Sequence, residues 1–377
     1  MINVLYICHD YEQMGGAALS LANLLDSVKD QVYPILLLRQ DGPVADYFRE
    51  RGYDVLIHDY ALNISSNNRW YRIATYVPRR LRDKATNRRC TEFVLSQFKG
   101  KKVDIVHTNS SVISYGVELA KELNAKHVWH VREYYSVGLN KTPLEGFMRL
   151  REKMRDADAV ICITKEVKKH WQMEDNGKAF VISDAVRSER DTAWVERKEK
   201  YVVFCSATLI PSKGTEEAVE IFCKSGISQK GYNLCLIGRC QDDYKQVLLD
   251  VAKQYGVENQ LDFLGFRKDI KPILEKAAAF LMCSRFEGLG RVTIEAMFYG
   301  CPVLAFNSGG TRSIINDGTN GVMYETVDDA AEKLRKLVND NSYAQQLAKA
   351  AQEDAIVNFS DEAFGKKLSE LYKKILG

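Results

Sequence analysis

The residues whose types and spacing could do chemistry gather in the segment SRFEGLGRVTIEAMFYGCPVLAFN, which covers residues 284–307. Glu287 lies in a predicted loop, where Gly288 and Gly290 allow a tight backbone turn. A helix is predicted to start near Arg291 or at the next residue. The unpaired N–H groups and positive dipole end of a helix N-terminus suit a phosphate group. The segment therefore predicts an anion site between a strand and a helix.

Glu295 lies about one turn into the same predicted helix. A carboxylate there can accept hydrogen bonds from both hydroxyls of a ribose diol, each worth about 1.5–3 kcal/mol. Two glutamates eight residues apart are a weak signal by themselves. They gain weight between a predicted strand and helix, around a Gly-x-Gly turn and before a Gly-Cys-Pro sequence. The alternative interpretation is a pair of solvated glutamates at a helix end.

Lys213 is the second candidate anion-binding group. It stands in TLIPSKGTEEAVE, at a predicted strand-to-helix turn with Gly214. A lysine there can neutralise a diphosphate as charge builds on it. An exposed surface lysine is the alternative.

Gly15 and Gly16 form a similar turn after the first predicted strand, where the backbone could approach a phosphate or sugar. A plain tight turn remains the alternative there. The segment lacks the G-x-G-x-x-G fingerprint, which disfavours a dinucleotide site.

Other candidates stand at the ends of predicted strands. His107 ends one strand and His130 another, where catalytic groups gather in parallel sheets. A satisfied structural histidine is the alternative for each. Arg239 is a candidate phosphate contact. Arg132 and Glu133 follow His130 and could bind an acceptor substrate.

The elements that must position these residues alternate along the chain as strand, helix and strand. This pattern predicts two doubly wound α/β domains with parallel sheets. We expect them over residues 1–190 and 195–357, facing a central cleft, with a charged linker at 188–200. A C-terminal helix over 358–377 is expected to cross back to the first domain.

Composition narrows the class of protein. Hydrophobic residues make up 46% and charged residues 27%, as in an ordinary globular protein. The nine cysteines contain no C-x-x-C pair, which favours reduced thiols in a cytoplasmic protein over disulfides or a metal site. Residues 69–102 hold eleven Lys or Arg against two acids, together with Trp70. That stretch suits an anionic membrane surface at the inner face of the cell membrane or a lipid-diphosphate acceptor, with a solvated helical face as the alternative. Nucleic-acid binding is not expected, because nothing else in the chain fits a known nucleic-acid-binding motif.

The segment from Glu287 to Ala305 resembles the family-four glycosyltransferases, whose E-x7-E element reads EGFGRVTVEAMACGTPVI. A looser resemblance covers most of the chain. It implies a GT-B fold of two Rossmann-like domains, retention of anomeric configuration, and no metal or other cofactor, since the nucleotide sugar is a substrate. It also implies that Glu287 contacts the donor sugar, that Glu295 holds the ribose and that Lys213 binds the diphosphate.

The resemblance extends to further positions and has departures. It implies that the backbone of Gly288, Leu289 and Gly290 and the glycine pair Gly15–Gly16 face the donor. It also implies that His107 borders the active site, that His130 lies near the reacting sugar, and that the backbone of the loop containing Phe266 meets the nucleobase. Thr208 stands where the family has an arginine, and Arg291 is a candidate to replace its charge. Ser313 stands where the family usually has a glutamate.

The expected activity is transfer of a sugar from a UDP- or GDP-linked donor to a saccharide or lipid-linked acceptor, in cell-surface polysaccharide or glycolipid biosynthesis. A nucleotide-sugar epimerase of the same fold is one alternative. A non-catalytic sugar- or lipid-binding protein is another, because the arginine expected at Thr208 is missing.

Overall fold

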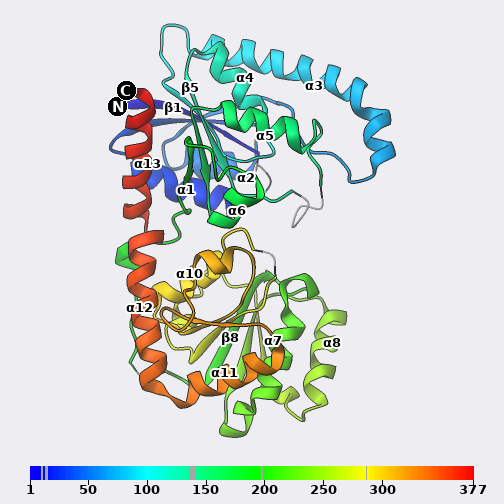
Figure 1. The fold of residues 1–377 in the computed structure, drawn as a ribbon, viewed down its shortest axis with the longest axis vertical. Helices are drawn as coiled ribbons and strands as arrows, with labels where there is room; N and C mark the ends of the chain where they lie inside the picture. Colours follow the sequence, from blue (N-terminus) through cyan, green and yellow to red (C-terminus); the bar gives the residue numbers. More distant parts are fainter. Residues whose placement is uncertain (10–11, 13–15, 136–140, 197, 286) are drawn as a thin grey trace. The chain divides into compact units, whose positions relative to one another are not determined.

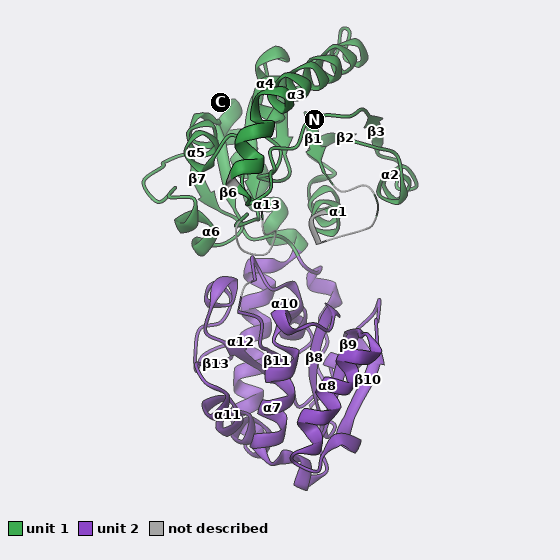
Figure 2. Ribbon diagram, turned by 90° about the vertical axis from the view of Figure 1, so that its right-hand side faces the viewer, with its two compact units in different colours: residues 1–185, 361–377 green, residues 186–360 purple. Residues whose placement is uncertain are grey.

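The computed structural model describes residues 1–377 except 10–11, 13–15, 136–140, 197 and 286. It divides the chain into two compact units, coloured separately in Figure 2. Unit 1 contains Met1–Ala185 and Asp361–Gly377, and unit 2 contains Val186–Ser360. The predicted α/β class is confirmed in both units.

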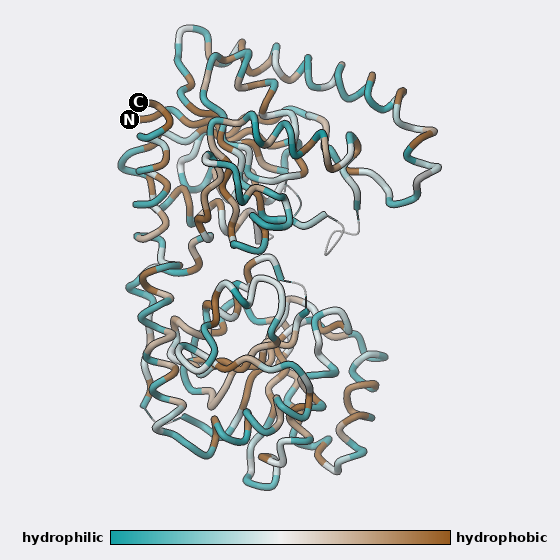
Figure 3. Tube along the Cα trace, in the orientation of Figure 1, coloured by the Kyte–Doolittle hydropathy of each residue, from teal (hydrophilic) through white to brown (hydrophobic). Residues whose placement is uncertain are grey.

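Unit 1 is built on a parallel sheet that has, among the described residues, seven strands in the order β3-β2-β1-β4-β5-β6-β7. Most strands are buried along nearly their whole length, as expected for a parallel sheet covered by helices on both faces. The apolar trace of these strands lies inside the unit in Figure 3. The strands are β1 (Ile2–Cys8), β2 (Val32–Leu38), β3 (Asp54–Ile57), β4 (Ile105–Thr108), β5 (Lys126–Val131), β6 (Ala159–Cys162) and β7 (Ala179–Val181).

The helices of unit 1 connect these strands, and the C-terminal helix joins them (Figure 1). That last helix packs on the first one so closely that a Cβ on Gly365 would lie 2.3 Å from the carbonyl oxygen of Ser27. Its Tyr372 hydroxyl also lies 3.1 Å from the Tyr6 hydroxyl on β1. The helices are α1 (Gly16–Val28), α2 (Pro43–Arg49), α3 (Arg69–Gln97), α4 (Tyr115–Glu122), α5 (Phe147–Asp156), α6 (Lys165–His170) and α13 (Asp361–Leu376).

Unit 2 repeats the same architecture. Over its described residues, a parallel sheet of six strands has the order β10-β9-β8-β11-β12-β13. The strands β8, β11 and β12 are therefore neighbours near the middle of the sheet. The strands are β8 (Tyr201–Thr208), β9 (Asn233–Arg239), β10 (Leu261–Gly265), β11 (Ala279–Met282), β12 (Val303–Phe306) and β13 (Val322–Tyr324).

The helices of unit 2 bury their apolar faces on this sheet and on one another. Two short 3₁₀ helices, η2 (Pro211–Lys213) and η5 (Gly309–Ser313), follow β8 and β12. The α-helices are α7 (Thr215–Ser225), α8 (Asp242–Lys253), α9 (Lys271–Leu274), α10 (Arg291–Phe298), α11 (Val327–Asn339) and α12 (Asn341–Phe359).

The boundaries differ slightly from those expected at residues 190, 195 and 357. The first division falls after Ala185 because the backbone N–H of Val186 donates to the carbonyl of Phe359 at the end of α12. Arg187 also pairs through its backbone with Ser360. These contacts belong to unit 2, so the segment before the predicted linker is already part of that unit.

Two further features concern the chemistry of the chain. Each of its nine cysteines is a free thiol, and most of them are buried. In the part of the chain that the structure describes, no helix has an apolar run long enough to cross a bilayer.

Candidate donor site in the C-terminal unit

Two candidate residues of unit 2, and a glycine pair that packs against one of their loops, follow three neighbouring strands. Lys213 follows β8, Glu287 follows β11, and Gly309 and Gly310 follow β12. The strands are parallel and adjacent, so these loops lie at one edge of the sheet. Ligands of doubly wound sheets bind at this carboxyl edge.

Lys213 and Glu287 form an ion pair, with 2.7 Å between the lysine Nζ and the carboxylate Oε1. The side chains are 36% and 21% exposed, so both can still reach a ligand. Gly214 follows the lysine with a φ of +76°. A Cβ on Gly214 would lie 2.3 Å from the carbonyl oxygen of Cys283, at the end of β11. Glycine at this position thus lets the lysine turn pack directly against the strand that leads to Glu287.

The loop between β11 and α10 is held by the glycine pair after β12. The N–H of Gly310 donates to the carbonyl oxygen of Glu287 at 2.8 Å. A Cβ on Gly310 would lie 2.4 Å from the carbonyl oxygen of Gly288. Gly290 is the N-cap residue of α10 with a φ of +80°, and the helix begins at Arg291, where the sequence pattern placed it. Close backbone packing therefore sets the position of the amide groups at the start of α10.

Glu295 lies within α10 and is buried. Its carboxylate Oε1 is 2.9 Å from the guanidinium of Arg187, which also donates to the hydroxyl of Tyr299 at 2.7 Å. Burial raises the pKa of the Glu295 carboxyl, while Arg187 and then Arg291 act in the opposite direction. Burial acts to lower the pKa of Arg187, but Glu295 and Tyr299 outweigh it, and the net shift is upward. The net shift of the Glu295 pKa is also upward, and Arg187 opposes the effect of burial through its pairing with this carboxylate one turn into α10.

Arg187 was not predicted as a site residue. It precedes the charged segment that was predicted to be a linker, and no spacing connects it to Glu295. Only the folded chain brings the two together, so periodicity had no means of finding it. The expected replacement cation, Arg291, is the first residue of α10, and its charge acts on Glu295.

The structure also brings Arg239 and Phe266 together. Arg239 ends β9 and Phe266 follows β10, and the guanidinium carbon lies 4.8 Å from the centre of the phenyl ring. Both side chains are exposed at the same edge of the sheet. A planar cation on an aromatic ring is a surface on which a nucleobase could stack.

In unit 1, His107 and His130 are fully buried. The Nδ1 atom of His107 is 2.6 Å from the hydroxyl of Tyr372, and its Nε2 atom is 3.3 Å from Nδ1 of His130. The Nε2 atom of His130 lies 3.3 Å from Asp184. Burial lowers the pKa of His130 to about 4 and that of His107 well below its usual value. Both rings are therefore neutral, in surroundings that favour the structural alternative, and their predicted catalytic role stays a prediction.

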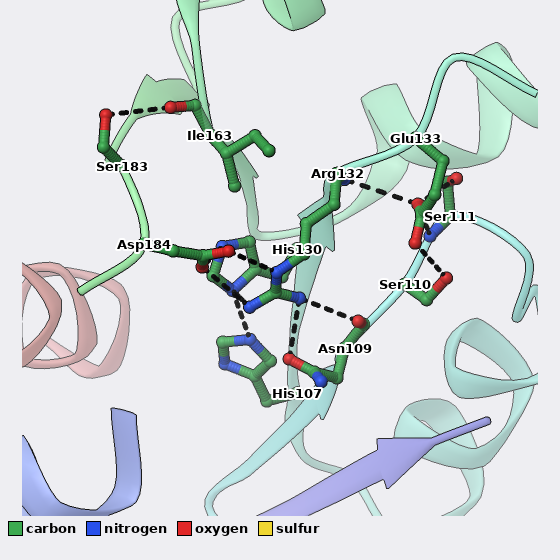
Figure 4. A network of polar contacts seen from close by, with 10 residues as sticks. All are labelled: His107, Asn109, Ser110, Ser111, His130, Arg132, Glu133, Ile163, Ser183 and Asp184. Carbon is green, nitrogen blue, oxygen red and sulfur yellow. Dashed lines mark hydrogen bonds and ion pairs between the residues drawn. The ribbon is translucent and has the colours of Figure 1, made fainter. Parts of the chain in front are cut away.

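Figure 4 shows that the buried Arg132 is the centre of this network. Its guanidinium donates to both carboxylate oxygens of Asp184, at 2.8 and 2.9 Å, and to the carbonyl of Asn109 at 2.8 Å. Burial alone would raise the pKa of Asp184, but Arg132 and His130 reverse this and hold it well below its usual range. The network connects the ends of β4 and β5 to the segment after β7, which gives Arg132 a structural partner the sequence did not predict.

Of the remaining predicted residues, Gly15 lies outside the described residues and Gly16 begins α1. Unit 1 has a polar pocket of about 460 Å³ at the carboxyl edge of its sheet. Its lining includes Asn63 from the segment after β3, Ser114 before α4 and Glu145 before α5. Arg80 and Lys84 of α3 add positive charge to the lining.

The two sheets and the E-x7-E loop define a Rossmann-like α/β protein with a candidate anion site in unit 2. Comparison with known families gives the class. Residues 186–354 match the family described as Glycosyl transferases group 1, and residues 43–190 match Glycosyltransferase Family 4. The chain belongs to this family of GT-B glycosyltransferases, and it is a glycosyltransferase.

Individual relatives agree with this assignment. An uncharacterized glycosyltransferase of Methanocaldococcus jannaschii is 24% identical over 353 residues, covering 91% of this chain and 90% of the relative. A lipopolysaccharide core biosynthesis glycosyltransferase of Rhizobium meliloti is 27% identical over 234 residues, covering 59% of this chain and 65% of that protein. Crystal structures of HepE from Anabaena, with UDP and with UDP and glucose, superpose with TM-scores of 0.80 and 0.76 at 18% identity. They cover 99% of this chain and 100% of that one.

Proposed function

We propose that this glycosyltransferase is a retaining, metal-independent hexosyltransferase that uses a UDP- or GDP-linked sugar as its donor. The observation that carries the proposal is the Lys213–Glu287 pair, 2.7 Å apart at the carboxyl edge of the unit 2 sheet. The pair combines a cation suited to a diphosphate with a carboxylate suited to sugar hydroxyls. The start of α10 adds backbone N–H groups and a positive dipole end to the same edge.

Each of these groups binds a different part of the donor. Glu295 accepts hydrogen bonds from the ribose hydroxyls, and Arg187 pairs with this buried carboxylate and opposes its protonation. The amides of Gly288, Leu289 and Gly290 face the phosphates. Lys213 neutralises the negative charge that grows on the diphosphate as the anomeric bond breaks, which stabilises the transition state.

Glu287 contacts the sugar hydroxyls in this proposal and orients Lys213 through their ion pair. The departing phosphate takes the acceptor proton on the face from which it leaves, and this gives retention. The charges of Lys213 and Arg291 serve the role that a divalent cation would otherwise have. Activity is therefore expected to persist in EDTA.

The nature of the donor and acceptor is supported by the relatives. HepE was crystallised with UDP and glucose, which favours a uridine nucleotide here. The Rhizobium relative is named for lipopolysaccharide core biosynthesis, which favours a saccharide or lipid-linked acceptor. Unit 1 would hold that acceptor, with the polar pocket near Asn63 and Glu145 as the candidate place. A cytoplasmic location, in contact with the inner face of the cell membrane, belongs to the same proposal.

A panel of nucleotide sugars tests the proposal. The true donor should raise the melting temperature most, because a ligand that binds only the folded state stabilises it by mass action. Transfer to a saccharide acceptor, followed by NMR of the anomeric proton, then gives the stereochemistry. An inverted product, or loss of turnover in EDTA, would refute retention or metal independence respectively.

The same assay separates the alternatives. An epimerase would release an altered nucleotide sugar when no acceptor is present. A non-catalytic binding protein would bind the donor and neither hydrolyse nor transfer it. Slow hydrolysis of an unaltered sugar from the donor, with release of the nucleoside diphosphate, is the result expected of a transferase.

A further inference from the structure

The buried side chains of helix α3 lie in its last third, and the earlier part of the helix is tied to unit 1 by polar contacts, among them Arg149 to the Tyr76 hydroxyl at 3.1 Å and Arg80 to Glu145 at 3.8 Å. The buried side chains are Cys90 and Val94, followed by Phe98 just beyond the helix. The spacing of four residues places these three on one side of the helix. From Trp70 to Arg89, by contrast, no side chain is buried. Figure 1 shows the N-terminal end of α3 at the far edge of the unit, away from the sheet.

The part of α3 from Trp70 to Arg89 carries an apolar stripe. Trp70, Ile73, Val77 and Leu81 are 78%, 56%, 63% and 66% exposed. Because they are three or four residues apart, they project from the same side of the helix. A contiguous apolar surface on a soluble domain usually marks an interaction site. We refer to these four residues as the apolar stripe; Leu81, at its end, also lines the polar pocket of unit 1.

Basic residues surround the apolar stripe. Between residues 70 and 89 the chain has seven Lys or Arg and a single acid, Asp83. That acid is itself paired with Arg79 and Arg82. Arg82, Lys84 and Arg89 are exposed. The helix thus combines an apolar side with a strong excess of positive charge.

We propose that the N-terminal part of α3 docks on an anionic lipid bilayer, with the apolar stripe inserted among the acyl chains and the flanking arginines at the headgroups. An amphipathic helix with Trp and large aliphatic residues on one side and Arg on the other lies in the plane of a membrane interface. Long basic side chains can place their charge at the headgroups while their stems cover apolar surface. The charge excess favours anionic lipid over a second copy of this chain, because two such helices would repel each other.

This inference rests on the proposed function only for the idea that the acceptor is lipid-linked, since unit 1 is the acceptor unit and α3 also lines its polar pocket. Docking would hold the enzyme at the surface where such an acceptor resides. Membrane binding itself is measured without any turnover, so its failure is distinct from failure of the proposed transferase activity.

The experiment is cosedimentation of the full chain with large unilamellar vesicles. Vesicles of phosphatidylcholine alone are compared with vesicles that contain about one third phosphatidylglycerol. We expect binding to the anionic vesicles, at least tenfold weaker binding to the neutral ones, and clear weakening in 0.5 M salt because headgroup attraction is screened. Trp70 supplies a second readout. Its emission should shift to the blue on binding, and the shift should be lost in Trp70→Phe, since Trp129 and Trp171 are buried in unit 1 and Trp194, which is 36% exposed, belongs to unit 2.

Matched variants test which surface binds. Ile73→Asp with Val77→Asp should weaken binding to the anionic vesicles at least tenfold. Val247→Asp with Val357→Asp is the control, because these valines are also exposed on helices, at 43% and 65%, but in unit 2. The control pair should bind within about twofold of the wild type. The circular dichroism spectrum and the affinity for UDP should match those of the wild type in both double variants, which excludes misfolding.

Three results would overturn the inference. The first is equal binding of the wild type to neutral and anionic vesicles, or no binding to either. The second is unchanged binding of the Ile73→Asp/Val77→Asp variant. The third is a concentration-dependent dimer that the same variant abolishes, since the apolar stripe would then be covered by a second copy.

Discussion

Replacing Lys213 by alanine is the sharpest test of the donor site. The substitution removes a cation 2.7 Å from Glu287 at the edge where the diphosphate is proposed to bind. Two unit charges about 4 Å apart at a protein surface interact by roughly 4 kcal/mol at an effective dielectric constant near 20. Loss of one such group from a site of developing negative charge typically costs about 10²–10³-fold in turnover. We therefore expect kcat/KM to fall by about that factor in Lys213→Ala.

Stability should change little in the same variant. The pair is partly exposed to solvent, and exposed ion pairs contribute only about 0–1 kcal/mol. Lys224→Ala is the matched control, because Lys224 lies in the same unit, is 31% exposed and pairs with Glu220 and Asp328 at 3.0 Å. Steady-state transfer from the donor and the melting temperature are measured for both variants. The reasoning is refuted if Lys213→Ala keeps turnover within about threefold of the wild type, or if Lys224→Ala loses as much.

Three further predictions concern stability. Arg187→Met should lower the free energy of unfolding of unit 2 by about 1–3 kcal/mol, because it leaves the buried Glu295 carboxylate unpaired while Arg187 itself is 30% exposed. In a urea-unfolding double-mutant cycle, Glu295→Gln should recover part of that loss, and purely additive effects would contradict the pairing. Gly310→Ala should cost about 1–3 kcal/mol, since its Cβ would lie 2.4 Å from a backbone carbonyl oxygen. Gly177→Ala is the control in thermal melts, because a Cβ on Gly177 would have no atom within 4 Å. Equal melting temperatures for the Gly310→Ala and Gly177→Ala variants would refute the clash. Burial lowers the pKa of His127 from about 6.5 to about 4. Between these two pH values the unfolded chain binds a proton that the folded chain does not. The free energy of unfolding therefore falls as the pH drops from 6.5 to 4, by up to about 3 kcal/mol. Urea unfolding at pH 7 and pH 5 should show a smaller pH dependence in His127→Gln, and an unchanged dependence would exclude this histidine as the cause.

The sequence by itself determined the α/β class and the order of the elements. Buried strands of a parallel sheet are nearly continuous apolar runs, and the helices between them have a period near 3.6 residues, so both can be recognised locally. The E-x7-E loop was predictable for a similar reason. Its glycines, its helix start at Arg291 and its position after a strand all lie within a short stretch of chain.

Tertiary structure alone decided which distant residues became partners. Arg187 pairs with Glu295, and Arg132 pairs with Asp184, across separations that no periodicity spans. Burial also decided the surroundings of His107 and His130, because a histidine at a strand end reads the same in the sequence whether it faces a ligand or the core. The physical reason is that a local pattern records backbone preference and which side of an element is apolar. The energy of a buried charge depends instead on whichever group the rest of the fold brings within hydrogen-bonding distance.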